Sequence, residues 1–273
     1  MFDQDRAHGG EVRYNIHIMT LTHTVSKAAE LLERVSALSL QERRDSALLL
    51  RLSQEAEAMR SSDSLNTITS LAWISLYQNR IQEARNYYES ALKQFPDEYM
   101  IHLNYAASLC AAGFFTDAYL QARLAHNINP KTPACVQLII HILFASGRPH
   151  DALPWNNFLN KMKPHGNTAA NLTGLDSIIK YMNTNNIGDD DFEVLQKKAF
   201  SVLHKNGVYF TNNQLNLLED EDSQWISYEI FVDKPVAQIV NLNIKHAESL
   251  AYEAQIPKAA SKITFIYTSW RDE

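Results

Sequence analysis

Cysteine is scarce in this sequence of 273 residues, which contains Cys110 and Cys135 and no other. Two cysteines in a chain of this length do not make a disulfide framework. We interpret both as small buried side chains. We therefore expect a reducing compartment, with the cytoplasm as the default location.

Long apolar runs are also missing. No segment approaches the roughly 18 consecutive apolar residues that indicate a membrane-spanning helix. Residues 1–18 are polar and lack the apolar core of a signal peptide. We expect residues 1–23 to be disordered, and Met19 is an alternative to Met1 as the natural start of the chain.

Positive charge is in deficit, with 25 Lys and Arg residues against 31 Asp and Glu residues and a formal net charge of −6. No local run of Lys and Arg compensates for this deficit. A nucleic-acid-binding surface needs a concentrated basic face to meet the phosphates. The sequence thus argues against a nucleic-acid partner. Its 45% hydrophobic and 21% charged residues are typical of a globular protein, and its length suits about two domains.

Motifs for metal or catalytic chemistry are not evident either. The 10 histidines are scattered and never take the spacing of a zinc site with a third ligand nearby. The acidic run 219–222 lacks the alternating ligands and the glycine of a calcium loop. Gly9-Gly10 is not a phosphate loop, and no nucleophile motif is found. We expect no metal, no cofactor and no enzymatic activity, although a site assembled in three dimensions stays open for residues 189–273.

What the sequence does contain is an internal repeat. Prolines stand at 96, 130 and 164, at equal intervals along the chain. An alanine precedes each proline at a fixed distance, an Asn or Gly precedes that alanine, and other positions in the same phase are mostly apolar. The period, about 34 residues, is typical of stacked helical units. The in-phase residues are Asn79, Gly113 and Gly147; Ala84, Ala118 and Ala152; Leu71, Tyr105 and Ile139; Ala72, Ala106 and Ile140; and Ala91, Ala125 and Leu159.

Each unit is predicted to be a pair of antiparallel helices. The Asn or Gly accepts the left-handed backbone that ends the first helix. The alanine lets the two helices approach closely, and the proline stops the second helix. Thr132-Pro133 begins the third unit as an N-cap followed by proline at the first helical position. Pro154 falls inside a second helix, where we expect a kink or a late start.

These residues resemble the tetratricopeptide repeat family over residues 65–166, as units 65–98, 99–132 and 133–166. The family's usual aromatic residue near the start of each unit is replaced here, and so is its usual tyrosine in the first helix. The residues at these positions are Ile68, His102 and Val136 for the aromatic and Ser75, Leu109 and Leu143 for the tyrosine.

Helices are also predicted on both sides of the repeats. Residues 24–60 are expected to form a pair of helices, as an N-terminal cap or a degenerate repeat, with a capping box at Ser39 and Glu42. A further helix around Leu175 to Met182 is expected to close the other end of the stack. The solenoid thus spans residues 24–186, and residues 183–188 are typical of a linker.

The pattern changes after the linker, and the predicted order is α-β-β-α-β. Asp189 or Asp190 is expected to cap the first helix, which stops at Asn206-Gly207. Residues 226, 228, 230 and 232 recur at alternate positions and should share one face of a strand. We predict a mainly α chain with a small α/β module at 189–273, whose sheet is covered by helices on one face. The expected strands are 208–218, 225–232 and 263–270, and the second helix runs from Pro235 to about Ala254.

The family resemblance implies that the first helix of each unit lines a concave groove. This predicted groove is apolar and aromatic, and it lacks the Lys, Arg and Asn clamp with which some family members hold a C-terminal carboxylate. The groove residues implied by the resemblance are Asn66, Thr69, Trp73, Leu76 and Tyr77; Met100, Leu103, Ala107 and Cys110; and Ala134, Gln137, His141 and Phe144.

An apolar groove suits a peptide or an amphipathic helix with hydrophobic anchors. We therefore expect a non-enzymatic adaptor or chaperone-like binder of another protein, with possible dimerisation through the C-terminal module. Two alternatives stay open. The groove can be filled by the chain's own terminal segment or C-terminal module, and that module can instead be an enzyme or ligand sensor regulated by the repeats.

Overall fold

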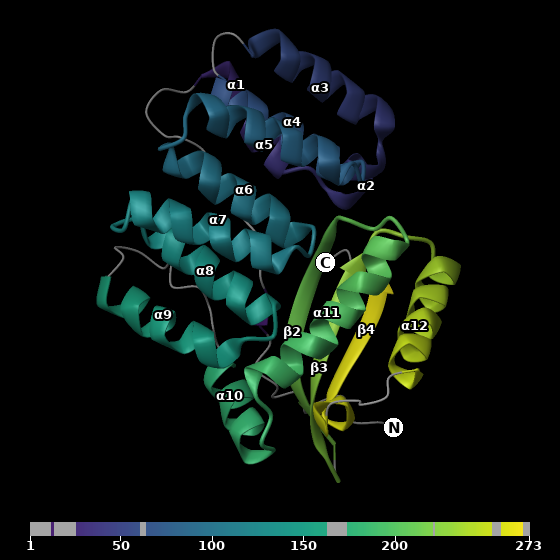
Figure 1. Ribbon diagram of the computed structural model, residues 1–273. Helices are drawn as coiled ribbons and strands as arrows, with labels where there is room; N and C mark the ends of the chain where they lie inside the picture. The colour runs from purple at the N-terminus through teal and green to yellow at the C-terminus, as the bar shows by residue number, and fades with distance from the viewer. Residues whose placement is uncertain are drawn as a thin grey trace, which may run out of the picture.

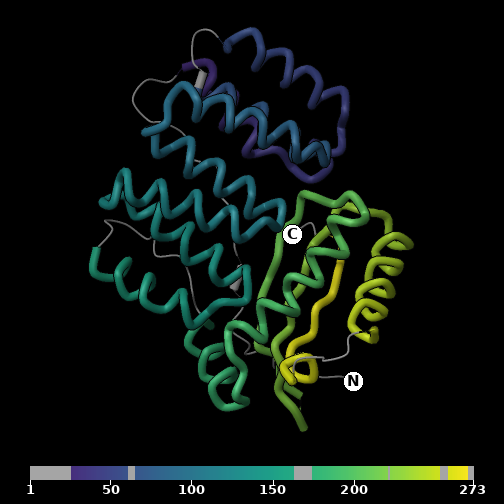
Figure 2. Tube along the Cα trace, viewed as in Figure 1, coloured from purple at the N-terminus to yellow at the C-terminus, as the bar shows by residue number. Residues whose placement is uncertain are grey.

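The computed structural model describes residues 12–13, 26–60, 64–162, 174–220, 222–252 and 258–269. The chain is mainly α-helical, and its helical hairpins are stacked one after another with a small sheet beside them (Figure 1). The tube in Figure 2 shows that neighbours in the stack are also neighbours in the sequence. Among the described helices, none is both long and apolar enough to cross a membrane.

The predicted helical hairpins are confirmed as three successive pairs. Their second helices begin at residues 81, 115 and 149, so the equal spacing read from the sequence is kept in the structure. In chain order the six helices are α4 (Ser64–Tyr77), α5 (Ile81–Gln94), α6 (Tyr99–Ala111), α7 (Phe115–Ile128), α8 (Pro133–Ala145) and α9 (Pro149–Met162).

The turn inside each hairpin has the predicted left-handed residue. The φ angles are 57° at Asn79, 77° at Gly113 and 79° at Gly147. The next N–H in each turn donates to the carbonyl five residues earlier, as in Phe114 N to Leu109 O at 2.9 Å. This is the hydrogen bond of a Schellman motif, which satisfies a carbonyl that the helix end leaves without a partner.

The packing residues of the repeat are buried as predicted, including Ala84, Ala118 and Ala152 at 1%, 0% and 0% exposure. Thr132 is the N-cap of α8 and Pro133 its first residue, although the Thr132 side chain makes no capping hydrogen bond. The late start expected for α9 is wrong, because this helix begins at Pro149 and continues through Pro154. The third in-phase proline, at 164, lies outside the described residues.

The N-terminal part forms helices α1 (Lys27–Ser36), α2 (Leu40–Arg44) and α3 (Ser46–Met59), with α1 and α3 packed against α4. The capping box at Ser39 and Glu42 is confirmed. The helix α2 that begins there is short, because Asp45, the residue that follows α2, is already the N-cap of α3.

The expectation of disorder for residues 1–23 is wrong at β1 (Val12–Arg13). These two residues pair antiparallel with Leu215 and Gln214 of a C-terminal strand. Backbone pairing of so short a segment leaves no alternating pattern in the sequence. The other residues of 1–23 lie outside the described part of the chain.

The C-terminal part follows the predicted order of elements. The elements are α10 (Leu175–Thr184), α11 (Asp189–Lys205), β2 (Thr211–Glu219), β3 (Gln224–Val232), α12 (Val236–Ala251), a short 3₁₀ turn at Lys258–Ser261 and β4 (Ile263–Ser269). The strand order is β1-β2-β3-β4, in which β2 and β3 are antiparallel and β3 and β4 parallel.

The predicted face of β3 is confirmed, since Ile226, Tyr228, Ile230 and Val232 are all at most 1% exposed, and Ser227 and Phe231 on the other face are buried as well. In the view of Figure 1, α11 and α12 lie on the same side of the sheet, and both contact β4. The buried residues of the sheet, α11 and the repeats belong to one hydrophobic cluster. The repeats and the C-terminal module therefore share a continuous core.

The start of α11 differs from the prediction, because its N-cap is Gly188 rather than Asp189 or Asp190. The Asp189 carboxylate instead accepts hydrogen bonds from the N–H groups of His150 and Asp151, at 3.2 and 3.0 Å. Asp189 therefore caps the first turn of α9 from another helix. The sequence could not indicate this, because a capping box is recognised only within one segment.

Candidate functional site

The predicted groove residues are buried, apart from Gln137 and Ala134, which are half-buried. The apolar ones are divided between two hydrophobic clusters. Trp73 and Phe144 belong to the main core, whereas Met100 and Leu103 form a second small cluster with Ala125 and Cys135. The expectation that these first helices present a continuous open surface is therefore corrected by the packing.

The first unit of the predicted groove is covered by the segment that leads into β2. The ring of Phe210 meets the ring of Tyr77 at 5.1 Å and the ring of Trp73 at 6.4 Å between centroids. The guanidinium of Arg43, from α2, lies 4.9 Å from the Tyr77 ring centre and 5.5 Å from that of Phe210. The chain's own residues thus occupy the place where an external anchor residue was expected.

The C-terminal module also satisfies the helix ends of the repeats. The Tyr228 hydroxyl donates to Ala145 O at 2.6 Å, and the Thr211 hydroxyl donates to Ala111 O at 3.2 Å. His204 Nε2 lies 2.8 Å from Ala112 O. These carbonyls close α6 and α8, where no intrahelical donor is available. Docking of the module is therefore part of the hydrogen bonding of the fold.

The thiols and the groove histidine have the chemistry of buried groups. Cys110 and Cys135 are free and buried. Burial raises the pKa of the Cys135 thiol to about 11 and that of Cys110 well above its usual range, so neither is a thiolate at neutral pH. Burial lowers the pKa of His141 to about 4, which keeps its imidazole neutral.

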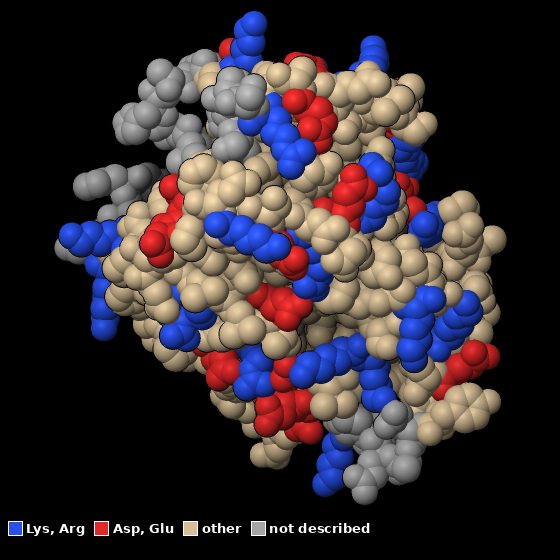
Figure 3. All heavy atoms as spheres, turned by 45° about the horizontal axis from the view of Figure 1, so that its top comes forward, with Lys and Arg blue, Asp and Glu red and all other residues tan. Residues whose placement is uncertain are grey.

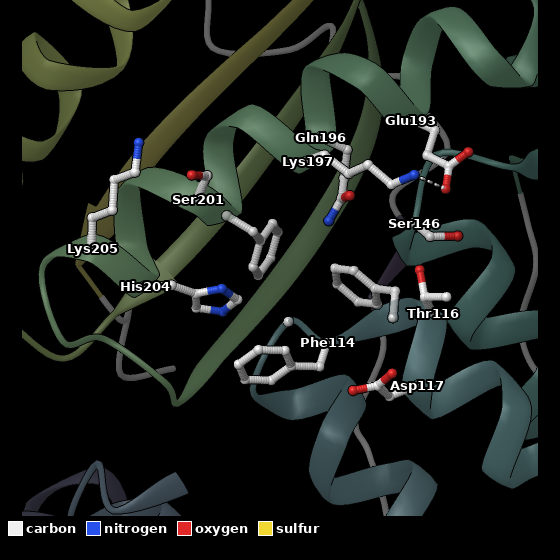
Figure 4. Close-up of a pocket in the computed structure, with 13 residues that line it drawn as sticks. Phe114, Thr116, Asp117, Ser146, Glu193, Gln196, Lys197, Ser201, His204 and Lys205 are labelled. Atoms are coloured by element: carbon white, nitrogen blue, oxygen red, sulfur yellow. Dashed lines mark ion pairs between the residues drawn. The ribbon is translucent and has the colours of Figure 1, made fainter. Parts of the chain in front are cut away.

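A cavity of about 330 Å³ lies where the repeats meet α11 (Figure 4). Its walls come from the α6–α7 turn, the start of α7, the end of α8 and one side of α11. The lining residues are Gly113, Phe114, Phe115, Thr116, Asp117, Ser146, Glu193, Gln196, Lys197, Phe200, Ser201, His204 and Lys205.

Aromatic rings form much of the cavity wall. Phe114 stacks on His204 with 4.4 Å between centroids, and Phe115 meets Phe200 edge-on at 4.9 Å. The Arg85 guanidinium lies 4.6 Å from the Phe114 ring centre. Burial lowers the pKa of His204, so the neutral ring donates its Nε2 proton to Ala112 O.

Both carboxylates at the cavity have cationic partners. Asp117 pairs with Arg85 at 2.9 Å. Glu193 pairs with Arg148 at 2.6 Å and with Lys197 at 2.8 Å. Figure 4 shows the Lys197 amine directed at Glu193, away from the middle of the cavity. The negative charge of these two acids is therefore locally compensated.

Gln196 places a buried polar group at the cavity. Its side chain is buried, at 2% exposure, and its Nε2 has no hydrogen-bond partner among the described residues. A buried amide donor without a partner costs about 1–3 kcal/mol. Such a group is uncommon in a folded protein and calls for an explanation.

The sequence does not reveal this cavity, because its two sides lie far apart in the chain. One signal was available. Gln196 lies four residues after Phe192 and three before Ala199, both on the apolar stripe of α11. A glutamine on such a stripe is a polar group placed where a core side chain is expected.

Within the described ranges, no group of three or more His, Cys, Asp or Glu side chains is placed to hold a metal ion. Comparison with protein-family models, with curated proteins and with solved structures finds no match. The charged side chains of the face in Figure 3 are interspersed, with neither sign gathered into one field.

Proposed function

We propose that the chain is a non-enzymatic interaction adaptor built on tetratricopeptide-like repeats. The regular spacing of its helical hairpins and their left-handed turns support the family resemblance. The first unit of the predicted groove is covered by Phe210 and Arg43, and most residues of the other two units are buried, so the partner needs another surface. We place the partner contact on the outer face of α12.

The observation that carries this proposal is an exposed apolar ridge on α12. Val236, Val240 and Ile244 are 71%, 52% and 53% exposed and follow one another at four-residue spacing. The opposite side of the helix is used for the core, where Ile239 and Leu242 are 6% and 4% exposed. Exposed apolar side chains gathered on one helix face are typical of an interaction surface.

The partner that fits this ridge is an amphipathic helix of another protein. Residues at four-residue spacing form a ridge that packs into the groove of a facing helix. No charged side chain lies between Lys234 and Lys245, so the middle of the contact carries no formal charge. Lys234, which precedes the helix, favours an acidic residue on one side of the partner's apolar stripe. Lys245 instead donates to Asn206 Oδ1 at 2.6 Å.

Site-specific photocrosslinking in native cells tests this surface. A photoreactive amino acid at Val240 should give a discrete crosslinked partner, whereas the same group at Leu50, which is 57% exposed on α3, should not. Adding Ile244→Asp should remove the crosslink without unfolding the chain, because exposed substitutions change stability by about 0.5 kcal/mol or less.

Two outcomes would contradict the proposal. The same crosslinked species at Val240 and Leu50 would mean that the α12 ridge has no special role. A crosslink between two copies of this chain at Val240 would replace the external partner by a homodimer through the C-terminal module.

A further inference from the structure

The cavity beside α11 meets the first turn of α7, a helix of 14 residues. The N-cap residue Phe114 supplies no side-chain hydrogen bond to this turn. The first N–H groups of a helix have no acceptor within it, and the helix dipole makes this end favourable for negative charge. Phe115 and Thr116 therefore bring main-chain donors to the cavity.

A second donor reaches the same space from the opposite wall. Figure 4 shows the side-chain amide nitrogen of Gln196 directed from α11 toward the α6–α7 turn. This nitrogen is the buried Nε2 that has no partner in the described part of the chain. An acceptor on a ligand would satisfy it and remove the cost of leaving it unpaired.

The remaining surroundings define the ligand's charge and shape. Asp117 and Glu193 are already ion-paired, and His204 is neutral and donates to a main-chain carbonyl. The lining also contains the Lys205 amine and the hydroxyls of Thr116 and Ser201, each of which can donate a hydrogen bond to a carboxylate. The rings of Phe114, Phe115 and Phe200 offer an apolar wall, and a volume of about 330 Å³ accommodates a small molecule.

We propose that this cavity binds the carboxylate of a small aromatic or apolar acid, with the carboxylate between Gln196 Nε2 and the first turn of α7 and the apolar part against the phenylalanine rings. Because the cavity walls come from both the repeats and the C-terminal module, binding would couple the two. The site is independent of the α12 ridge, and its failure would leave the adaptor proposal intact.

The same chemistry can come from a free organic acid or from the C-terminal carboxylate of a peptide, so the probes separate these sources. 3-Phenylpropionate represents a free acid, and N-acetyl-phenylalanine represents a peptide end. N-acetyl-phenylalanine amide has the same ring without the charge. Calorimetric titration of the full chain should give saturable binding with at least one of the two acids and none with the amide.

The decisive variant is Gln196→Leu, which replaces the amide side chain by an apolar side chain of similar size. Affinity for the acid should fall about tenfold or more, since a hydrogen bond to a charged group is lost. The thermal midpoint without ligand should stay the same or rise, because an unsatisfied buried group has been removed. If Gln196 had a merely structural role, its loss would lower the affinity for the acid and the thermal midpoint together.

Lys197→Gln provides a second variant, with Lys180→Gln as its matched control on α10. Lys197→Gln should weaken acid binding several-fold by leaving the Glu193 carboxylate less compensated, and Lys180→Gln should bind as wild type. Failure of both acids to bind, equal binding of acid and amide, or an unchanged affinity in Gln196→Leu would each overturn the proposal. Binding of only one acid would support it and identify the source of the carboxylate.

Discussion

A Cβ atom on Gly113 would overlap Cδ1 of the Phe200 ring. Gly147, in the next repeat turn, stands in the same relation to Phe192, at 2.8 Å from Cδ2. The two phenylalanines are eight residues apart on α11 and the two glycines are one repeat apart. The glycines thus have two physical roles, because they supply the left-handed φ of the hairpin turn and leave room for the rings of α11.

The double role of Gly113 gives a prediction with a matched control. Gly113→Ala should destabilise the chain by strain at positive φ, about 1–2 kcal/mol, and by about 1–3 kcal/mol more from the clash with Phe200. Gly207 has a φ of 69° and no atom within 4 Å of a built Cβ, so Gly207→Ala should show the strain alone. Urea unfolding measures both, and equal losses would contradict the docking role of Gly113.

The contact between Tyr77 and Phe210 should be measurable as a coupling energy. Each single change to alanine removes a ring from an edge-on pair at 5.1 Å. A double-mutant cycle in urea should give a coupling of about 0.5–1.5 kcal/mol. A coupling near zero would mean that Phe210 does not hold the first repeat closed in solution.

Trp73 is expected to behave as a core residue in the same measurements. It is 3% exposed, so Trp73→Ala should cost about 3–5 kcal/mol. Loss of a partner in a Trp73→Ala variant would then report unfolding rather than a groove. A Trp73→Ala chain as stable as wild type would contradict this prediction. Trp73 would then again be a candidate anchor residue on the surface.

The repeat architecture could be predicted because its signals are local. The turn glycines, the prolines that end helices and the in-phase alanines act within one hairpin. The structure keeps their regular spacing. The buried face of β3 formed by residues 226, 228, 230 and 232 could be predicted for the same reason. A period of two with one buried face is visible in the segment itself.

The covering of the groove could not be predicted, because it depends on contacts between distant segments. Phe210 and Tyr77 are far apart in the chain, and neither position differs in pattern from a surface aromatic residue of a binding groove. An apolar helix face indicates only that something covers it. Which segment does so is decided by tertiary packing, as is the capping of α9 by Asp189.

The buried His141 imidazole predicts a pH dependence of stability. Its pKa is about 4 in the folded chain, below the ordinary value of 6.5. Between these two pH values the unfolded state binds more protons, so the contribution is present above pH 6.5 and is lost as the pH falls toward 4. The full loss is about 3 kcal/mol.

His141→Gln tests this contribution, because glutamine does not titrate. Urea unfolding at pH 7 and at pH 4.5 should show a smaller loss of stability in the variant than in wild type. Burial also lowers the pKa of His246, so the variant should keep part of the decline. Parallel pH profiles for the two chains would contradict the assignment to His141.

Asn243 closes the outer edge of the sheet at β4, the last strand in the order. Its side-chain Nδ2 donates to Tyr267 O, and Tyr267 N donates to its Oδ1, both at 2.9 Å. One amide therefore takes the place of a neighbouring strand. Edge strands with unpaired main-chain groups invite pairing with another chain, and this amide removes one such pair of groups.

Asn243→Ala should therefore act on both stability and association. The Tyr267 N–H and C=O would lose their partners, at a cost of about 1–3 kcal/mol in the free energy of unfolding. Light scattering during incubation should show more concentration-dependent association than in wild type, because the β4 edge is open. Asn241→Ala is the control, since Asn241 is exposed on the same helix. If both alanine variants unfold and associate alike, Asn243 does not protect the edge, and the covering of β4 must come from the body of α12.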